Sequence, residues 1–426
     1  MKAREAAFRV VHEVLFKKGY SNIALEQILT NENFDGKDAG FITEIVLGTL
    51  RNKNLLEYIV SKYSNIKIKK ISPSAMTSIL TGAYQILFMD RTPDSAACNE
   101  AVKIASKFAG QRTRGFVNAV LRAISREKEH IDDRFKNLNG LELISIKYSC
   151  SMEAVEKMYN QYGKEKTIEI LKNMNQPAHT CIRFNDGKGK EANENLLKTY
   201  GIVFNRGNIA SEAYYLRLSK PVSSLELYKD GILSIQDEGA QAMGEFTSPD
   251  PGTKVMDACA SPGGKTIHMA CQMNGTGEIT ACDIYSQRVK NMKENFSRVK
   301  FSNIESVQKD MSVPHDEYKA KFDTVLVDAP CSGLGTAQRR PEIKLFYKED
   351  SSLYELQDKI LGSCADYVKP GGSLIYGTCT FFREENREAV DRLLKKREEF
   401  ILSEEKTILP DGMAGSFYMA KLVREI

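Results

Sequence analysis

The stretch that decides the fold is KVMDACASPGGKT, residues 254–266, in which an apolar run ends at an aspartate just before a pair of glycines. The run predicts a buried strand, and IHMACQM (267–273) after it predicts a helix. Gly263 and Gly264 allow the backbone to approach a ligand closely, while the N-terminus of the helix favours an anionic group. A plain strand–helix turn is the simpler alternative, so the neighbouring strands decide between the two.

Outward from this stretch, apolar runs alternate with amphipathic helical segments from about residue 223 onward. The runs cover residues 254–258, 278–283, 304–307, 324–328 and 373–376. This alternation predicts an α/β domain over residues 223–426, built on a doubly wound, mainly parallel, Rossmann-like sheet. Ligands bind at the carboxyl ends of the strands in such sheets, so we expect the reactive residues to meet there.

Acidic residues at the strand ends indicate an adenosyl cofactor. Asp283 ends the second run, 20 residues after Gly263, where a carboxylate commonly accepts the ribose hydroxyls. Asp310 follows the third run and is either a helix N-cap or a contact to adenine. The sequence contains neither GxGxxG nor the Walker spacing GxxxxGK[ST]. This absence disfavours dinucleotides and ATP, and leaves S-adenosylmethionine as the better cofactor.

Two cysteines follow neighbouring strands of the predicted sheet. FDTVLVDAPCSGLGT (322–336) carries Asp328 and Cys331, and GGSLIYGTCTF (371–381) carries Cys379. A thiol beside an adenosyl cofactor suits methylation of a pyrimidine at C5, because thiolate addition to C6 makes C5 nucleophilic. A base must then remove the C5 proton. An exocyclic-amine methyltransferase would instead carry an Asn/Asp-Pro-Pro-aromatic motif, whose last position is Cys331 here. The residues alone do not order the two thiols.

The first 135 residues predict an all-helical domain, because apolar residues recur there at helical spacing. Ser72 and Pro73 are typical of a helix start. This portion holds 21 Lys/Arg and 15 Asp/Glu, whereas the remainder holds 39 and 41. The excess of positive charge indicates a polyanionic partner. Four arginines are expected to form a stripe that faces RNA: Arg112, Arg114, Arg122 and Arg126.

Residues 136–222 predict a small α+β connector, with a helix over 153–173 and strands over 180–184 and 202–204.

The composition, 42% hydrophobic and 27% charged, is that of a globular protein. No apolar run approaches the roughly 20 residues of a membrane span, and no signal-peptide core is present, so we expect a cytoplasmic protein. Nine cysteines without a Cys-x-x-Cys pair and five scattered histidines predict reduced thiols and no metal site.

DACASPGGKT, DAPCSGLGT and GTCTF resemble motifs of the RNA cytosine-5 methyltransferases of the Sun/Fmu (RsmB) family. NEAVKIA (99–105) and GFVNAVLR (115–122) resemble the NusB-like RNA-binding domain of its bacterial branch. The similarity covers nearly the whole chain and is most specific over residues 235–385. It implies S-adenosylmethionine as methyl donor and 16S rRNA as substrate, and the sequence gives no sign of an obligate protein partner.

Residue by residue, the resemblance implies that Cys379 is the nucleophile and that Cys331 is associated with product release. Analogy with DNA cytosine-5 methyltransferases would choose Cys331 as the nucleophile instead. Lys265 is expected to help hold a thiolate. Arg339 and Arg340 are expected to touch RNA near a target base flipped out of its stack. The implied cofactor contacts are Cys259, Ala260, Ser261, Pro262, Gly263, Gly264, Lys265, Asp283, Asp310 and Asp328.

The sequence departs from the family pattern at three places. Thr380 stands where the Thr-Cys-Ser motif has serine, Ser261 replaces an alanine, and PEIKL (341–345) replaces Pro-Asp-x-x-Trp. We predict a 16S rRNA (cytosine-5-)-methyltransferase. The alternatives are the same reaction on tRNA and a non-catalytic RNA-binding or antitermination factor, with a dinucleotide oxidoreductase a distant third. Retention of Cys331, Cys379 and Asp328 argues against a non-catalytic factor.

Overall fold

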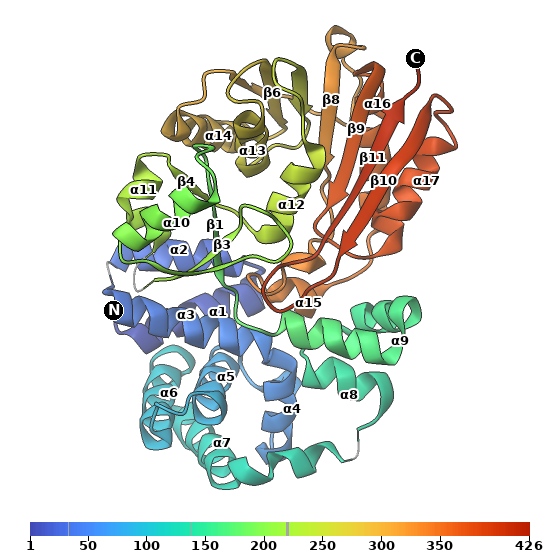
Figure 1. Cartoon of the computed structure of the whole chain (residues 1–426). Coiled ribbons are helices and arrows are strands. Elements are labelled where there is room, and N and C mark those ends of the chain that lie inside the picture. Colours follow the sequence, from blue (N-terminus) through green and yellow to red (C-terminus); the bar gives the residue numbers. More distant parts are fainter. Residues whose placement is uncertain (33, 137, 219–220) are drawn as a thin grey trace. The chain divides into compact units, whose positions relative to one another are not determined.

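The computed structural model of the chain describes all residues except 33, 137, 219 and 220. Two units are distinguished (Figure 1), one made of Met1–Gln176 with Ala337–Glu349 and the other of Pro177–Thr336 with Asp350–Ile426. The first is helical and the second is mixed α/β. The predicted fold class is therefore confirmed. Within the described ranges, no helix combines the length and apolar character needed to cross a bilayer.

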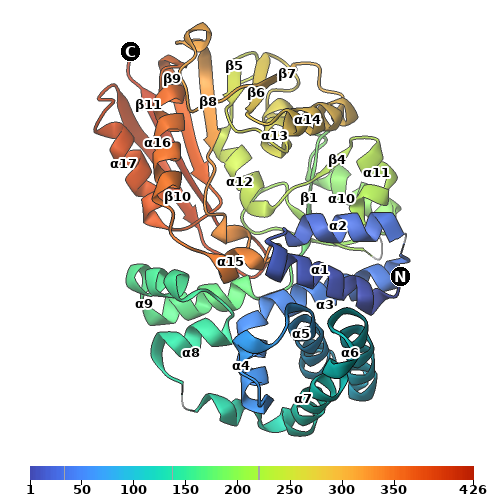
Figure 2. The same cartoon turned by 180° about the vertical axis from the view of Figure 1, so that it is seen from behind.

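The helical unit is built around two apolar clusters. One lies chiefly between α1 and α3, and the other among α4, α5, α6 and α7, the last three of which lie side by side (Figure 2). Ser72 caps α5 as predicted, because its hydroxyl accepts the backbone N–H of Ala75. The helices are α1 (Ala3–Lys17), α2 (Ser21–Glu32), α3 (Gly36–Arg51), α4 (Lys53–Tyr63), α5 (Pro73–Phe88), α6 (Asp94–Ala109), α7 (Arg114–Glu127), α8 (Gly140–Lys147) and α9 (Met152–Met174).

A segment from far along the sequence completes this unit. It contains the short helix α15 (Glu342–Phe346), orange in Figure 1 among the blue and teal helices. Lys344 is fully buried, and its ammonium group donates to the carbonyl oxygens of Arg51 (3.1 Å), Tyr148 (2.5 Å) and Ser149 (2.7 Å). The Glu342 carboxylate accepts from the N–H (3.0 Å) and the hydroxyl (2.7 Å) of residue 21. The helical core thus closes around residues 337–349.

The second unit begins with a small antiparallel sheet in the order β2-β3-β1-β4. Apolar side chains on β1, β3 and β4 pack with α10 and α11 into one cluster. The predicted strand over 180–184 is observed, and the predicted strand over 202–204 is observed one residue later. The elements are β1 (Thr180–Phe184), α10 (Lys190–Thr199), β2 (Val203–Arg206), β3 (Tyr214–Arg217), α11 (Glu226–Lys229) and β4 (Leu233–Ile235).

A seven-stranded sheet forms the main body of the second unit, in the order β10-β11-β9-β8-β5-β6-β7. Strands β5 to β9 are mutually parallel, and β10 and β11 are antiparallel additions at one edge. Helices α16 (Ser351–Ala365) and α17 (Arg387–Leu394) cover the face turned to the viewer in Figure 2. The strands are β5 (Lys254–Asp257), β6 (Glu278–Asp283), β7 (Ile304–Gln308), β8 (Phe322–Asp328), β9 (Val368–Thr378), β10 (Phe400–Ile408) and β11 (Phe417–Arg424).

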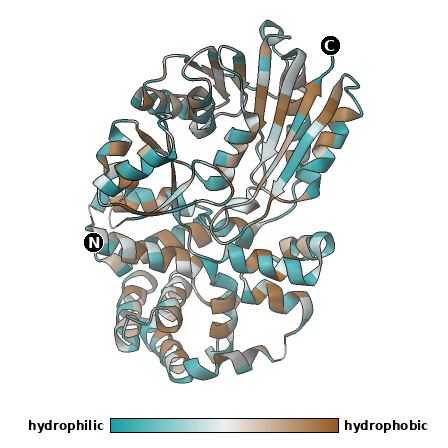
Figure 3. Ribbon diagram, viewed as in Figure 1, coloured by the Kyte–Doolittle hydropathy of each residue, from teal (hydrophilic) through white to brown (hydrophobic). Residues whose placement is uncertain are grey.

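The parallel strands β5, β6, β8 and β9 are largely buried and apolar, as a sheet covered on both faces requires, whereas the edge strand β7 is only partly buried. Figure 3 shows hydrophobic residues along these strands and mixed stripes on the surrounding helices, which include α12 (Glu238–Thr247), α13 (Gly264–Gln272) and α14 (Ser286–Val299). The chain passes from β5 to β6 and β7 on one side, and returns to β8 and β9 on the other. The switch point therefore lies between β5 and β8, and the residues that follow both strands meet there.

Candidate active site

The loop after β5 brings the backbone close to the switch point. Gly263 has φ 97°, and a Cβ atom there would lie 2.6 Å from the ring of Phe296, so only glycine fits. Its N–H donates to the carbonyl of Ala260 (2.6 Å), and the N–H of Ala260 donates to the carbonyl of Cys282 on β6 (2.8 Å). The loop is thereby fixed to the sheet and leads directly into the N-terminus of α13, which favours negative charge.

Asp283 and Asp310 follow neighbouring parallel strands, as predicted. One carboxylate oxygen of Asp283 accepts the N–H of Tyr285 (2.9 Å), and the other lies 3.7 Å from the guanidinium of Arg288. Asp310 accepts the hydroxyl (2.6 Å) and the N–H (2.9 Å) of Ser312, and these hydrogen bonds lower its pKa. Asp310 therefore caps a turn as an ionised group. Its contact to adenine stays a prediction.

Lys265 and Asp328 form an ion pair at the switch point. The Lys265 ammonium lies 2.5 Å from the Asp328 carboxylate and 5.2 Å from the centre of the Phe417 ring. Burial opposes the charge of Lys265, but the Asp328 carboxylate outweighs it and raises the pKa of Lys265. Behind this pair, burial raises the pKa of Asp257 to about 7, and the hydroxyl of Thr266 donates to it. Lys265 thus stays positively charged at neutral pH.

The two predicted thiols meet at the ends of β8 and β9. The sulfur atoms of Cys331 and Cys379 lie 3.3 Å apart, and the N–H of Cys379 also donates to the Cys331 sulfur (3.3 Å). The hydrogen bond with Cys379, together with burial, raises the pKa of Cys331 well above its usual range. Burial likewise raises the pKa of Cys259, which packs against the main core. Burial therefore favours the neutral form of both thiols, Cys331 and Cys259.

Three residues around the thiols were missed by the sequence analysis: Ser332, Glu385 and Asn386. Glu385 and Asn386 are buried, and they hydrogen-bond the loops that carry the two cysteines. They lie six and seven residues after Cys379, at the start of α17. An adjacent acid and amide, two residues beyond the apolar pair Phe381-Phe382, is the signal that could have drawn attention to them.

The predicted arginines lie in the helical unit. Arg112, Arg114, Arg122 and Arg126 are exposed, the last three on α7, whereas Arg339 and Arg340 are half-buried in the segment Ala337–Glu349. Their contacts with RNA stay predictions. Across the residues that the structure describes, we find no group of three or more His, Cys, Asp or Glu side chains arranged to hold a metal ion.

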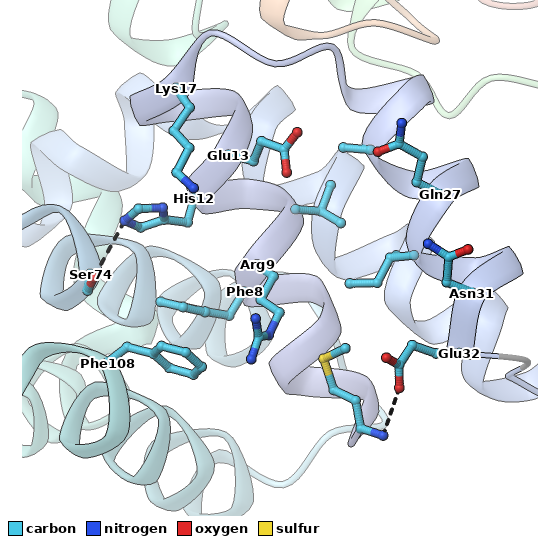
Figure 4. Close-up of a pocket in the computed structure, with 14 residues that line it drawn as sticks. Phe8, Arg9, His12, Glu13, Lys17, Gln27, Asn31, Glu32, Ser74 and Phe108 are labelled. Atoms are coloured by element: carbon cyan, nitrogen blue, oxygen red, sulfur yellow. Dashed lines mark hydrogen bonds and ion pairs between the residues drawn. The ribbon is translucent and has the colours of Figure 1, made fainter.

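A cavity of about 430 Å³ lies in the helical unit (Figure 4), lined by residues of α1, α2 and α5 together with Phe108 of α6. The Phe8 and Phe108 rings stack in it with centroids 4.8 Å apart, and His12 lies 3.4 Å from the Ser74 hydroxyl. None of the predicted cofactor or thiol residues lines this cavity. We therefore locate the active site from the strand ends rather than from the cavity.

Lys265 is expected to control the reactivity of the thiols. Lys265→Met removes the positive charge, so thiolate formation at Cys379 needs a higher pH, and the pH profile of its alkylation shifts upward by roughly one pH unit. Iodoacetamide labelling across pH, with the modified cysteine located by mass spectrometry, measures this shift. Lys290→Met, which removes an exposed lysine of α14, is the control. Identical profiles for the two variants would exclude the role of Lys265.

Comparison with known proteins agrees with this geometry. The family model "16S rRNA methyltransferase RsmB/F" matches residues 246–422, and the NusB family model matches residues 1–126. The probable ribosomal RNA small subunit methyltransferase B of Bacillus subtilis is 31% identical over 401 residues, which cover 93% of this chain and 89% of the relative. Ribosomal RNA small subunit methyltransferase B of Vibrio vulnificus is 30% identical and covers 100% of both chains.

Solved structures show the same architecture. The crystal structure of a methyltransferase homologue from Pyrococcus horikoshii is 26% identical and superimposes with a TM-score of 0.57, covering 64% of this chain and 95% of that one. Another solved structure, 24% identical, superimposes with a TM-score of 0.80 over 98% of both chains. The latter likeness extends to the fold of nearly the whole chain.

A Rossmann-like sheet with a glycine loop and paired thiols at its switch point, preceded by a NusB domain, defines an RNA methyltransferase. The chain belongs to the RsmB/F family of ribosomal RNA methyltransferases, because relatives about 30% identical match it along nearly its full length.

Proposed function

We propose that this protein transfers a methyl group from S-adenosylmethionine to C5 of a specific cytidine in 16S rRNA, through a covalent cysteine adduct at C6. The observation that carries the proposal is the pair of thiols 3.3 Å apart at the ends of β8 and β9, next to the glycine loop. A methyltransferase acting on an exocyclic amine or an oxygen has no need for a thiol nucleophile.

The residues at the switch point fit S-adenosylmethionine, which supplies an electrophilic methyl group when bound. Gly263 packs against the ring of Phe296 and turns the loop into the N-terminus of α13, where an anionic group of a ligand is favoured. Asp283 ends β6, where a carboxylate commonly accepts ribose hydroxyls, and Asp310 lies two residues beyond the next strand, β7. The loop 259–265 and Asp328 complete the proposed contacts.

We assign nucleophilic attack to Cys379. This assignment follows the resemblance to the RsmB family, in which the thiol of the Thr-Cys motif attacks, and the cation of Lys265 favours a thiolate nearby. Attack by the Cys379 thiolate forms the S–C6 bond and places the electron pair at C5, which then takes the methyl group. Removal of the C5 proton returns the electrons to the ring and expels the thiolate. The S–H group of Cys331 can donate to the departing sulfur, which connects it to product release.

The helical unit supplies the proposed RNA contact. Four exposed arginines lie on or next to α7, and the region matches the NusB family. Exposed cations bind the phosphate backbone without regard to sequence. The relatives, which are small-subunit ribosomal RNA methyltransferases, favour ribosomal RNA of the small subunit over tRNA as the substrate, and we place the protein with that RNA in the cytoplasm.

The direct test is methylation of defined RNAs by the full chain. We expect labelled S-adenosylmethionine to yield 5-methylcytidine in 16S rRNA and not in bulk tRNA. S-Adenosylhomocysteine should raise the melting temperature of the protein, and NAD should not. Methylation of tRNA alone would favour the tRNA alternative. Folded protein that binds S-adenosylhomocysteine but modifies neither RNA, including 16S rRNA in a partly assembled subunit, would favour a non-catalytic RNA-binding factor.

A further inference from the structure

Two adjacent residues connect the loops that carry the thiols. Glu385 ends a short 3-10 turn after β9, and Asn386 immediately precedes α17. Their side chains are among the least accessible polar groups of the unit, with residue exposures of 1% and 3%. Polar side chains this buried are kept only where hydrogen bonds compensate for lost hydration. The partners of those hydrogen bonds show what the two residues do.

Glu385 holds the loop of Cys331. One carboxylate oxygen accepts the N–H of Ser332 (2.7 Å), and the other accepts the Ser332 hydroxyl (2.6 Å). The amide of Gln357 donates both to Glu385 (3.3 Å) and to the carbonyl of Pro330 (2.9 Å). The residues on both sides of Cys331 are therefore fixed by one buried network. The carboxylate acts on Cys331 through the backbone rather than on the sulfur itself.

Asn386 holds the loop of Cys379 in the same manner. Its carbonyl oxygen accepts the hydroxyl of Thr378 (2.5 Å), and its amide nitrogen donates to the backbone carbonyl of Thr380 (3.1 Å). Both neighbours of Cys379 are thus attached to a single amide group. The two loops are bridged by the cysteines themselves and by Ser332, whose hydroxyl lies 3.0 Å from that of Thr380.

We propose that Glu385 and Asn386 are positioning residues with separate tasks, Glu385 for the thiol of Cys331 and Asn386 for the thiol of Cys379. The proposal rests on the proposed function and adds residues to its site. The two tasks follow from the hydrogen bonds, because Glu385 and Asn386 each hold the residues next to a different cysteine. Loss of Asn386 should therefore slow formation of the adduct more than its release, and loss of Glu385 should slow release more than formation.

Glu385→Gln and Asn386→Ala are the informative variants. Glutamine can accept the N–H of Ser332 but has only one acceptor oxygen, so we expect release to slow and the covalent protein–RNA adduct to accumulate, as with Cys331→Ala. Asn386→Ala is expected to slow adduct formation by about 100-fold with no accumulation, because misplacement of a nucleophile has an effect of that order. Asn386→Asp keeps the acceptor for Thr378, so its rate of adduct formation should lie between those of wild type and Asn386→Ala.

The measured quantity is the ratio of trapped adduct to 5-methylcytidine, per molecule that binds S-adenosylhomocysteine. Partial unfolding removes adduct and product together and leaves this ratio unchanged. Glu388→Gln makes the same chemical change at an exposed position of α17 and serves as the matched control. The proposal predicts a raised ratio for Glu385→Gln and a ratio no higher than that of wild type for Asn386→Ala.

Equal ratios in both variants and in wild type would overturn the proposal and leave the pair with a structural role only. Failure of the proposed function would look different. Wild type would then form no 5-methylcytidine, or Cys331→Ala would trap no adduct, whatever happens at residues 385 and 386.

Discussion

Replacing Cys379 with alanine is expected to lower methyl transfer to 16S rRNA by roughly 1,000-fold or more and to abolish the covalent adduct, because no S–C6 bond can form without the nucleophile. Cys331→Ala is expected to give the opposite signature. The Cys379 thiolate still attacks, but its departure loses a hydrogen-bond donor 3.3 Å away, so the adduct accumulates. Denaturing electrophoresis of protein with labelled 16S rRNA measures the adduct, and nucleoside analysis measures 5-methylcytidine.

A matched control is needed because alanine also removes a sulfur atom from each loop. Cys98→Ala removes a thiol from the core of the helical unit and should leave both readouts close to wild type. An adduct that accumulates in Cys379→Ala instead would reverse the assigned roles of the two thiols. It would also support the analogy with the Pro-Cys nucleophile of DNA cytosine-5 methyltransferases.

Lys344→Met is expected to lower the free energy of unfolding of the helical unit by about 3 kcal/mol, because it leaves three buried carbonyl oxygens without their donor. Methionine has a similar length and brings no charge, so the loss reports mainly on those hydrogen bonds. Denaturant titration measures the change. Lys348→Met, four residues later and exposed, should change the free energy by less than about 0.5 kcal/mol. Equal unfolding free energies of the two variants would contradict the conclusion that the hydrogen bonds of Lys344 stabilise the helical unit.

The same lysine gives the stability of the unit a pH dependence. Burial lowers the pKa of Lys344 to about 7, well below its value in an unfolded chain. Between pH 7 and about 10 the unfolded state therefore binds more protons than the folded state, and the folded state gains stability as the pH rises. The difference in unfolding free energy between wild type and Lys344→Met should be larger at pH 9 than at pH 7. A constant difference would show that the lysine is not titrating in this range.

The sequence allowed the sheet and the meeting of the thiols to be predicted, because both follow from local pattern. Apolar runs that end in Asp257, Asp283 and Asp328 indicate parallel strands, and the carboxyl ends of parallel strands share one edge of the sheet. Cys331 and Cys379 follow two such strands, so their proximity is a consequence of topology. The observed 3.3 Å between the sulfur atoms confirms that expectation.

The contacts of Lys344 could not be predicted in this way. The sequence showed PEIKL (341–345) only as a departure from the family pattern, whereas in the structure Lys344 is buried against carbonyls 195 to 293 positions earlier in the chain. Backbone carbonyls carry no signature in a sequence, so no pattern identifies them as partners of a lysine. Glu385 and Asn386 were missed for the same reason, since their partners are mostly backbone groups and hydroxyls of other loops.

The inclusion of residues 337–349 in the helical unit has a consequence for the order in which the protein is made. A ribosome releases residues 1–176 first, yet the donor for the carbonyls of Arg51, Tyr148 and Ser149 is synthesised only after β5 to β8. The helical unit can therefore complete these contacts only after Lys344 has left the exit tunnel. A gene fragment that ends at codon 176 encodes the helices without the segment Ala337–Glu349 that packs among them. An expression plasmid for this unit needs the later segment supplied as a second peptide or moved by circular permutation.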